Sequence, residues 1–189
     1  MRIAVLALQG AFVEHEQMLR RLGADVFEVR NLRDLQQPKD GLVLPGGEST
    51  VQTKLLWQTG LLEPVRLAIA EGLPVLATCA GLILLAKQEE GKPRNGLCTI
   101  DIDVVRNAYG RQLGSFHTLG HVKGFDTDVP MTFIRAPFVG KTLSPDVEVL
   151  SEVDGHIVAV RQHNQLATAF HPELTDDLRL HQLFLSRGR

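Results

Sequence analysis

Short apolar runs alternate with amphipathic stretches over the first ninety residues. Residues 3–8, 42–44 and 74–77 are nearly continuous apolar runs, which are typical of strands buried on both faces of a parallel sheet. Residues 25–29 form a further strand candidate. Between these runs, the spacing of apolar residues predicts helices at 12–22, 49–59, 62–71 and 82–88. The alternation of strand and helix predicts a mostly parallel sheet with helices on both faces.

The second half of the chain has a different pattern. Short strand candidates occur at 100–106, 121–125, 131–134, 147–153, 156–161 and 165–170, separated by Gly, Pro and Asp. These segments predict antiparallel additions to the sheet. The leucine spacing over 176–186 predicts a final helix.

The composition fits a globular protein of the cytoplasm. The chain has 189 residues, of which 44% are hydrophobic and 22% charged, and its formal net charge is −2. This balance argues against broad binding to nucleic acid or to a membrane surface. Two cysteines are too few for a disulfide scaffold, and no stretch approaches the ~20 apolar residues that span a bilayer. The first strand follows Met1 without a signal-peptide pattern, so we expect one cytoplasmic domain over residues 1–189.

Cys79 is a candidate nucleophile. It lies between an apolar strand and an apolar helix, among the small residues Ala77, Ala80 and Gly81. A sharp strand-to-helix turn that exposes a nucleophile requires small neighbours, because the backbone is crowded there. The start of a helix also favours the thiolate, which is the reactive form of cysteine. The alternative is a small buried hydrophobic residue, which is the interpretation that we keep for Cys98.

His171-Pro172-Glu173 follows the last predicted strand and supplies a candidate base. A residue before proline favours an extended conformation, in which residues two apart point the same way. Glu173 could therefore orient the His171 imidazole, whose second nitrogen could accept a proton from a thiol. A solvated surface turn is the competing interpretation. Most other histidines are expected to be structural or solvated, because none has a comparable carboxylate at a strand end; they are at positions 15, 117, 121, 156, 163 and 181.

Residues 45–50, with the sequence Pro-Gly-Gly-Glu-Ser-Thr, follow another predicted strand. Paired glycines allow backbone N–H groups to approach a ligand closely, and such groups can bind the oxyanion of a tetrahedral intermediate. Ser49 or Thr50 is expected to cap the following helix. A phosphate-binding loop is disfavoured because the Walker spacing and its lysine are absent, whereas a plain tight turn stays open. Ligands of open α/β sheets bind at the carboxyl ends of strands, so this loop, Cys79 and His171 together indicate acyl transfer through a thioester.

Three motifs resemble those of the class I (triad) glutamine amidotransferases: LPGGEST at 44–50, TCAGL at 78–82 and FHPEL at 170–174. Three narrower motifs are similar to those of the glutaminase subunits of pyridoxal 5′-phosphate synthases: LALQGAFVEH at 6–15, RNAYGRQ at 106–112 and FIRAPF at 133–138. The resemblance extends from residue 3 to about residue 173. It implies a three-layer, flavodoxin-like α/β fold with a mostly parallel sheet, helices on both faces and antiparallel additions in the C-terminal half.

The resemblance also implies roles for individual residues. Cys79 would attack the side-chain amide of L-glutamine, His171 would relay protons, and Glu173 would orient His171. The backbone N–H groups of Gly47 and Ala80 would form the oxyanion hole. The glutamine-binding residues would be Gly46, Gly47, Glu48, Arg106, Ile134 and Arg135, because an arginine suits an α-carboxylate. No metal and no cofactor is expected.

A partner protein is implied in the same way. The ammonia would pass to a (β/α)8-barrel synthase subunit that makes pyridoxal 5′-phosphate from ribose 5-phosphate and glyceraldehyde 3-phosphate. The complex would contain twelve copies of each subunit, and the glutaminase would be poorly active until its partner docks.

Three alternatives stay open. The first is a glutaminase subunit of another synthase, such as one that makes imidazole glycerol phosphate or anthranilate. The second is a stress-response or peptidase-like protein, in which a histidine commonly follows the cysteine where this chain has Ala80. The third is a non-catalytic module on the same scaffold. Ala77 replaces a glycine found in many triad amidotransferases, and Gly114 and His117 replace a more acidic stretch, which leaves partner docking open.

Overall fold

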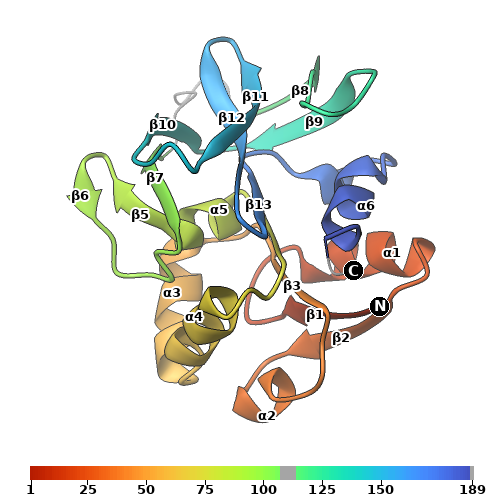
Figure 1. The fold of residues 1–189 in the computed structure, drawn as a ribbon, viewed down its shortest axis with the longest axis vertical. Helices are drawn as coiled ribbons and strands as arrows, with labels where there is room; N and C mark the ends of the chain where they lie inside the picture. The colour runs from red at the N-terminus through yellow and green to blue at the C-terminus, as the bar shows by residue number, and fades with distance from the viewer. Residues whose placement is uncertain (107–113, 188–189) are drawn as a thin grey trace.

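A computed structural model describes residues 1–106 and 114–187, and its main feature is a mixed sheet of eleven strands. One half of this sheet is parallel (Figure 1). Its strands, in spatial order, are β2 (Asp25–Val29), β1 (Arg2–Leu6), β3 (Gly41–Leu44), β4 (Val75–Thr78) and β13 (Gln165–Thr168). All residues of β3, β4 and β13 are buried, as expected for strands covered on both faces.

The other half of the sheet is mostly antiparallel. It continues from β13 through β12 (His156–Gln162), β10 (Phe138–Thr142), β7 (Ile100–Val105), β5 (Ala86–Glu89) and β6 (Lys92–Pro93). β11 (Glu148–Val153) pairs with β12, and β5 runs parallel to β7. A separate antiparallel pair is formed by β8 (Ser115–Gly120) and β9 (Val129–Ile134).

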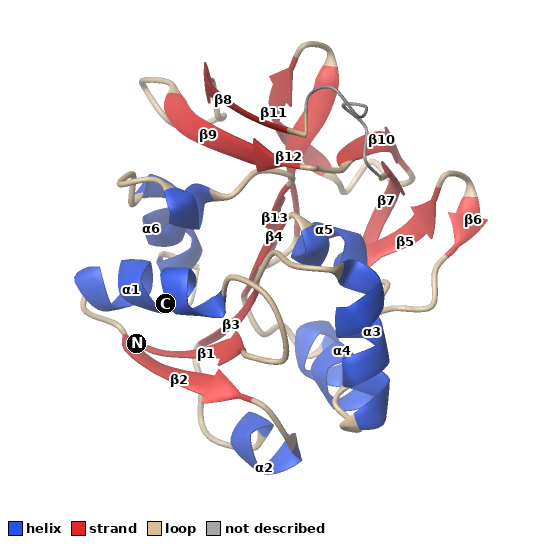
Figure 2. Cartoon of the chain, turned by 180° about the vertical axis from the view of Figure 1, so that it is seen from behind, coloured by secondary structure: helices blue, strands red, loops and turns tan. Residues whose placement is uncertain are grey.

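Helices cover both faces of the parallel half (Figures 1 and 2). One face carries α1 (Phe12–Arg21) and α6 (Arg179–Leu185), and the other carries α3 (Ser49–Gln58), α4 (Leu62–Ala70) and α5 (Ala80–Leu85). A single turn of helix, α2 (Leu32–Leu35), follows β2. Buried apolar side chains from these layers form one core cluster. The predicted three-layer α/β class with antiparallel additions is confirmed.

Several element predictions for residues 82 onwards were wrong. The helix predicted at 82–88 ends at Leu85, because residues 86–89 form β5 and pair with β7. Residues 121–125 are not a strand, and the partner of β9 is instead β8. The sequence analysis also missed β10, whose pairing with β7 shifts register between Val139 and Lys141. In each case the pairing of distant segments decides the structure more than local propensity does.

The order of strands positions the functional site. β1, β3, β4 and β13 are consecutive neighbours and run parallel, so their carboxyl ends lie at one edge of the sheet. The segments that follow these ends contain Gln9, Gly46, Cys79 and His171. Four segments that are far apart in the sequence therefore meet at one place, as expected for open α/β sheets.

Candidate active site

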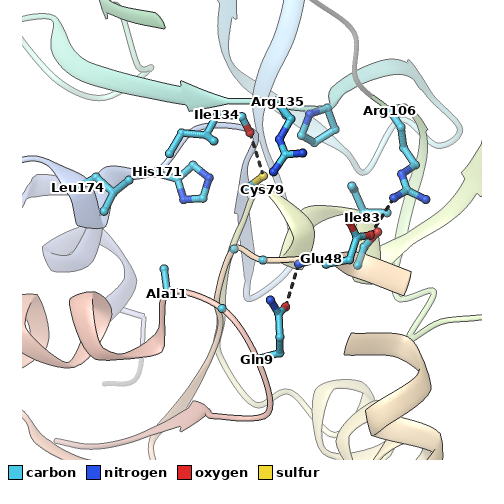
Figure 3. A pocket seen from close by; sticks show the side chains of 15 residues that line it. Gln9, Ala11, Glu48, Cys79, Ile83, Arg106, Ile134, Arg135, His171 and Leu174 are labelled. Atoms are coloured by element: carbon cyan, nitrogen blue, oxygen red, sulfur yellow. Dashed lines mark hydrogen bonds and ion pairs between the residues drawn. The ribbon is translucent and has the colours of Figure 1, made fainter. Parts of the chain in front are cut away.

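A pocket of about 420 Å³ lies at this edge of the sheet (Figure 3). It is lined by Gln9, Gly10, Ala11, Gly46, Gly47, Glu48, Ser49, Cys79, Ile83, Arg106, Ile134, Arg135, Pro137, His171 and Leu174. This set includes every residue proposed from the sequence except Ala80 and Glu173. Ala80 follows Cys79 at the start of α5, and Glu173 lies behind His171.

Cys79 occupies a strained turn between β4 and α5. Its φ is 48° and its ψ is −102°, a conformation that L-residues rarely adopt. The turn is tight because a Cβ on Gly81 would lie 2.2 Å from the carbonyl oxygen of Leu44. The Cys79 N–H donates to the carbonyl oxygen of Thr168 at 2.8 Å, which ties the turn to β13. The turn forms with Ala77 in place of glycine, and it presents the sulfur to the pocket.

His171 and Glu173 form a hydrogen-bonded pair beside this turn. His171 Nδ1 lies 2.6 Å from Glu173 Oε1, and both side chains are buried. The expected extended geometry was wrong, since Pro172–Leu174 is a turn of 3-10 helix. The two side chains nevertheless converge. The backbone N–H of His171 donates to the carbonyl oxygen of Thr132 at 2.8 Å, which fixes the chain at this point. The carboxylate therefore holds Nδ1 and leaves Nε2 as the ring nitrogen that can bond to Cys79.

The His171 ring and the Cys79 sulfur face each other across the pocket (Figure 3). Both contact the same glycine: a Cβ on Gly46 would lie 2.3 Å from His171 Cε1 and 3.4 Å from Cys79 Cβ. Burial by itself lowers the pKa of His171, but hydrogen bonding to Cys79 and to Glu173 raises it to about 10. The imidazole is therefore protonated at neutral pH.

The glycine loop after β3 is held by hydrogen bonds to several neighbouring segments. The Gly46 N–H donates to Thr78 Oγ1 at 3.0 Å, and the Gly46 carbonyl accepts from the Ala11 N–H at 3.0 Å. The Glu48 N–H donates to Gln9 Oε1 at 2.8 Å. Among the described residues, the Gly47 N–H between these anchors has no hydrogen-bond partner. The Gly47 N–H is therefore a free backbone donor in the pocket that Cys79 also lines.

Glu48, and not Ser49 or Thr50, is the N-cap of α3, which corrects the expectation from the sequence. Its carboxylate accepts hydrogen bonds from the N–H and the hydroxyl of Thr50. The hydrogen bonds from Thr50 and the nearby Arg106 lower the pKa of Glu48 despite partial burial. Arg106 Nη2 lies 3.1 Å from Glu48 Oε1. One acidic and one basic group therefore pair at the rim of the pocket.

Ile134 and Arg135 close the opposite side of the rim, at the end of β9. Both are exposed, and Arg135 has a positive φ of 41°. The Ile134 carbonyl oxygen lies 4.0 Å from the Cys79 sulfur. The predicted substrate-binding residues therefore surround the sulfur, with charged groups towards solvent.

Two groups of residues were missed by the sequence analysis. Gln9, Gly10 and Ala11 line the pocket after β1, and the strand-end argument applied to the first apolar run would have found them. His15 was expected to lack a carboxylate partner, which was wrong: its Nε2 lies 3.4 Å from Glu173 Oε2 in the interior. His181 is buried beside it. Helix α1 brings His15 to this place, and no local pattern signals that contact.

The remaining sequence expectations concern peripheral positions. Most of the RNAYGRQ motif, residues 107–112, lies outside the described residues. His117 Nδ1 lies 3.0 Å from Thr132 Oγ1, and no atom of the other described residues lies within 4 Å of where a Cβ on Gly114 would be. Cys98 is half-buried, and its thiol donates to the carbonyl oxygen of Arg94 at 3.3 Å. In the described part of the chain, no helix has the length and apolar character needed to cross a bilayer, and no cluster of three or more His, Cys, Asp and Glu is placed to hold a metal ion.

Known proteins resemble this chain over almost its whole length. The model of the SNO glutamine amidotransferase family matches residues 5–188. A curated relative from Methanocorpusculum labreanum, named pyridoxal 5′-phosphate synthase subunit PdxT, is 58% identical over 98% of this chain and 96% of its own length. A protein of the same name from Desulfitobacterium hafniense is 54% identical over 98% of this chain and 92% of its own length.

Solved structures show the same fold. A crystal structure described as a glutamine amidotransferase has a TM-score of 0.90 at 44% identity and covers 98% of both chains. The structure of PurLQS from Thermotoga maritima, at 14% identity, has a TM-score of 0.69 over 100% of this chain and 99% of the matched chain and shares the fold. A family match over almost all of the sequence, with close full-length relatives, leads to one conclusion: this chain belongs to the SNO glutamine amidotransferase family.

Proposed function

We propose that this chain is the glutaminase subunit of a pyridoxal 5′-phosphate synthase and hydrolyses L-glutamine to L-glutamate and ammonia. One observation carries the proposal: Cys79, His171 and Glu173 converge on a pocket at the strand ends of a glutamine amidotransferase. Relatives with 54–58% identity are named as subunits of that synthase, which favours this assignment over the glutaminase of another synthase. Residues 1–189 would act as one amidotransferase domain.

The first half of the reaction is an acyl transfer to sulfur. The Cys79 thiolate attacks the side-chain amide carbon of glutamine, and the N–H groups of Gly47 and Ala80 receive the negative oxygen of the tetrahedral intermediate. The protonated His171 donates its Nε2 proton to the departing nitrogen. The C–N bond breaks, ammonia leaves, and a glutamyl thioester remains on Cys79.

The second half is hydrolysis of the thioester. His171 is now neutral and takes a proton from a water molecule, whose oxygen attacks the thioester carbon. The C–S bond breaks, glutamate leaves, and the thiolate and the imidazolium are restored. Glu173 keeps the His171 ring oriented throughout by accepting its Nδ1–H.

The rim of the pocket would recognise the amino-acid end of the substrate. Arg106 and Arg135 suit the α-carboxylate of glutamine, and Glu48 suits its α-ammonium group. Ile134 lines the pocket. Gly46 and Gly47 let the loop backbone pack closely against His171 and Gln9, because a Cβ at either position would clash with these side chains. The pocket would therefore take free glutamine.

The ammonia would be delivered to a barrel-type synthase subunit, in a complex of twelve copies of each chain that makes pyridoxal 5′-phosphate. The relatives are named as subunits of this synthase, which supports a partner subunit. The reaction would occur in the cytoplasm, where a reducing environment keeps thiols free; both cysteines of this chain are free thiols.

The test is glutamate release from glutamine, measured with and without the barrel-type synthase subunit. We expect hydrolysis that depends on the partner, and formation of pyridoxal 5′-phosphate when ribose 5-phosphate and glyceraldehyde 3-phosphate are added. Cys79→Ala should abolish hydrolysis, whereas Cys98→Ala should retain it. A glutamine-like electrophile should label Cys79 and spare Cys98.

Two results would contradict the proposal. Hydrolysis by Cys79→Ala at a rate near that of the unmodified protein would exclude the thioester mechanism. If the chain hydrolysed glutamine but no pyridoxal 5′-phosphate formed with the synthase subunit, the glutaminase mechanism would stand. The assignment to this synthase would then be wrong, and the glutaminase of another amidotransferase would be favoured.

A further inference from the structure

His15 of helix α1 is buried directly behind the proposed catalytic residues. Its side chain is fully buried and contacts three polar groups from distant segments. Nε2 lies 3.0 Å from Thr78 Oγ1 and 3.4 Å from Glu173 Oε2, and Nδ1 lies 2.9 Å from His181 Nε2. Both ring nitrogens of this buried imidazole therefore have polar partners, which fix the orientation of the ring.

The protonation state of His15 follows from its surroundings. Burial lowers the pKa of His15, and the nearby charge of His171 adds to this effect, while Glu173 and Glu14 act in the opposite direction. Burial likewise lowers the pKa of His181, to about 3. Both rings are therefore neutral near pH 7, and each carries one N–H.

The position of the proton on His15 can be assigned from the contacts. A proton on Nδ1 would leave a bare Nε2 facing the Glu173 carboxylate, which places two acceptors opposite each other in the interior. A proton on Nε2 instead directs an N–H towards Glu173 Oε2 and Thr78 Oγ1, and Nδ1 then accepts from the Nε2–H of His181. This arrangement leaves His181 Nδ1 without a hydrogen on it, and that buried atom has no partner. An unpaired buried acceptor is tolerated better than an unpaired N–H group.

The Glu173 carboxylate has two oxygens with different partners. Oε1 accepts from His171 Nδ1 at 2.6 Å. Oε2 is buried and has no hydrogen bond of good geometry, and His15 Nε2 faces it at 3.4 Å. Without that N–H, Oε2 would be an unpaired buried charge, and the carboxylate could turn away from His171 to find a donor.

We propose that His15 is a positioning residue for the glutaminase reaction, whose Nε2–H holds the far oxygen of Glu173 so that the near oxygen stays bonded to His171. The inference rests on the proposed function and adds a residue to it. The same imidazole contacts Thr78, whose hydroxyl oxygen accepts the N–H of Gly46. Helix α1 therefore contacts both the base side and the glycine-loop side of the pocket through one ring.

The experiment compares His15→Leu with His15→Gln in the complex with the synthase subunit. Leucine removes the donor, whereas the amide nitrogen of glutamine can take the place of imidazole Nε2. We expect His15→Leu to lower kcat roughly 10- to 100-fold, the effect of a small misplacement of a reacting group, with KM changed less than about twofold. The alkaline limb of the profile of kcat against pH should move down by about one pH unit, because His171 loses part of its carboxylate contact. His15→Gln should restore both.

A matched control separates positioning from simple loss of stability. Leu19→Ala removes a fully buried side chain from the same helix, away from the pocket. It should lower the melting temperature but leave the kcat of the folded protein and its alkaline limb unchanged. If His15→Leu does not fold, His15→Asn replaces it, because the shorter asparagine amide cannot reach Glu173; kcat should then be low for His15→Asn and near normal for His15→Gln.

A second readout does not depend on glutamine hydrolysis. NMR of 15N-labelled histidine in the free chain should show His171 titrating at a lower pH in His15→Leu than in the unmodified protein. If that titration and the alkaline limb are both unchanged, or if His15→Asn and His15→Gln behave alike, the positioning role is wrong. If the unmodified complex hydrolyses no glutamine, the proposed function fails, and the NMR titration still decides whether His15 acts on His171.

Discussion

The two sides of the pocket are built differently. The inner side consists of Cys79, His171 and Glu173, which are at most 7% exposed and are tied to neighbouring strand ends by backbone and side-chain hydrogen bonds. The outer side carries Arg106 and Arg135, which extend from the ends of β7 and β9. Arg106 forms partly exposed ion pairs with Glu48 and Glu89.

This difference separates chemistry from recognition. Groups that exchange protons must hold their geometry closely, and burial among packed strand ends provides that rigidity. Charged side chains at the solvent-exposed rim can move to meet a ligand. Such movement costs the fold little, because exposed ion pairs contribute little to stability. We therefore expect substitutions on the inner side to lower kcat and substitutions on the outer side to raise KM.

After the complete loss expected for Cys79→Ala, the largest effect on the inner side is expected at Glu173. Glu173→Gln replaces the acceptor of the His171 Nδ1–H by an amide that can present N–H groups, which favours the wrong tautomer of the ring. We expect kcat for glutamine to fall roughly 10²- to 10⁴-fold, as for other triads. The surface variant Glu63→Gln, which loses an ion pair with Arg66, should keep normal kcat. A Glu173→Gln protein with at least a tenth of normal kcat would show that the inner side is less rigid than we infer.

The next effect is steric. Gly46→Ala places a methyl group about 2.3 Å from His171 Cε1, so the ring must move away from Cys79. We expect kcat to fall roughly 100-fold, measured by glutamate release in the complex. Gly114→Ala is the matched control, because among the described residues nothing lies within 4 Å of its Cβ position. Equal activity of the two alanine variants would mean that the ring has room to adjust.

The outer side is tested by Arg106→Gln. Loss of this guanidinium should raise KM for glutamine roughly tenfold, the effect of one hydrogen bond to a charged group, and change kcat little. Steady-state kinetics would separate the two parameters. Arg33→Gln, an exposed arginine on α2 far from the pocket, should change neither. If Arg106→Gln lowered kcat as much as Gly46→Ala does, the distinction between the inner and outer sides of the pocket would be wrong.

The smallest effect concerns the pH dependence of stability. Burial lowers the pKa of His181 to about 3, whereas the unfolded chain protonates this histidine near pH 6.5. Between these values the unfolded state binds more protons, so the free energy of unfolding falls as pH falls. His181→Gln should reduce this slope by at most about 1.4 kcal/mol per pH unit, as measured by urea unfolding from pH 7 to pH 4. An unchanged slope would mean that His181 is charged in the folded protein.

The sequence was most informative where local pattern and topology agree. The apolar runs of β1, β3 and β4 predicted a buried parallel sheet, and the strand-end rule then predicted that Cys79 and His171 meet. Prediction from the sequence failed where a segment takes its structure from pairing with a distant segment. Residues 86–89 have no strand pattern of their own and become β5 only by pairing with β7. The contact of His15 with Glu173 joins α1 to a segment near the C-terminus, and no sequence pattern in either segment predicts this contact.

The position of β13 has a consequence for how the protein is made. This strand is the last of the sheet to be synthesised, yet it lies between β4 and β12 in the middle of the sheet. Until it inserts, β4 has an unpaired edge, which is a template for pairing with other chains. His171 follows the same strand, so a nascent or truncated chain has no proton acceptor beside Cys79. Insertion of β13 therefore has two results at once: it covers the exposed edge of β4, and it brings His171 beside Cys79.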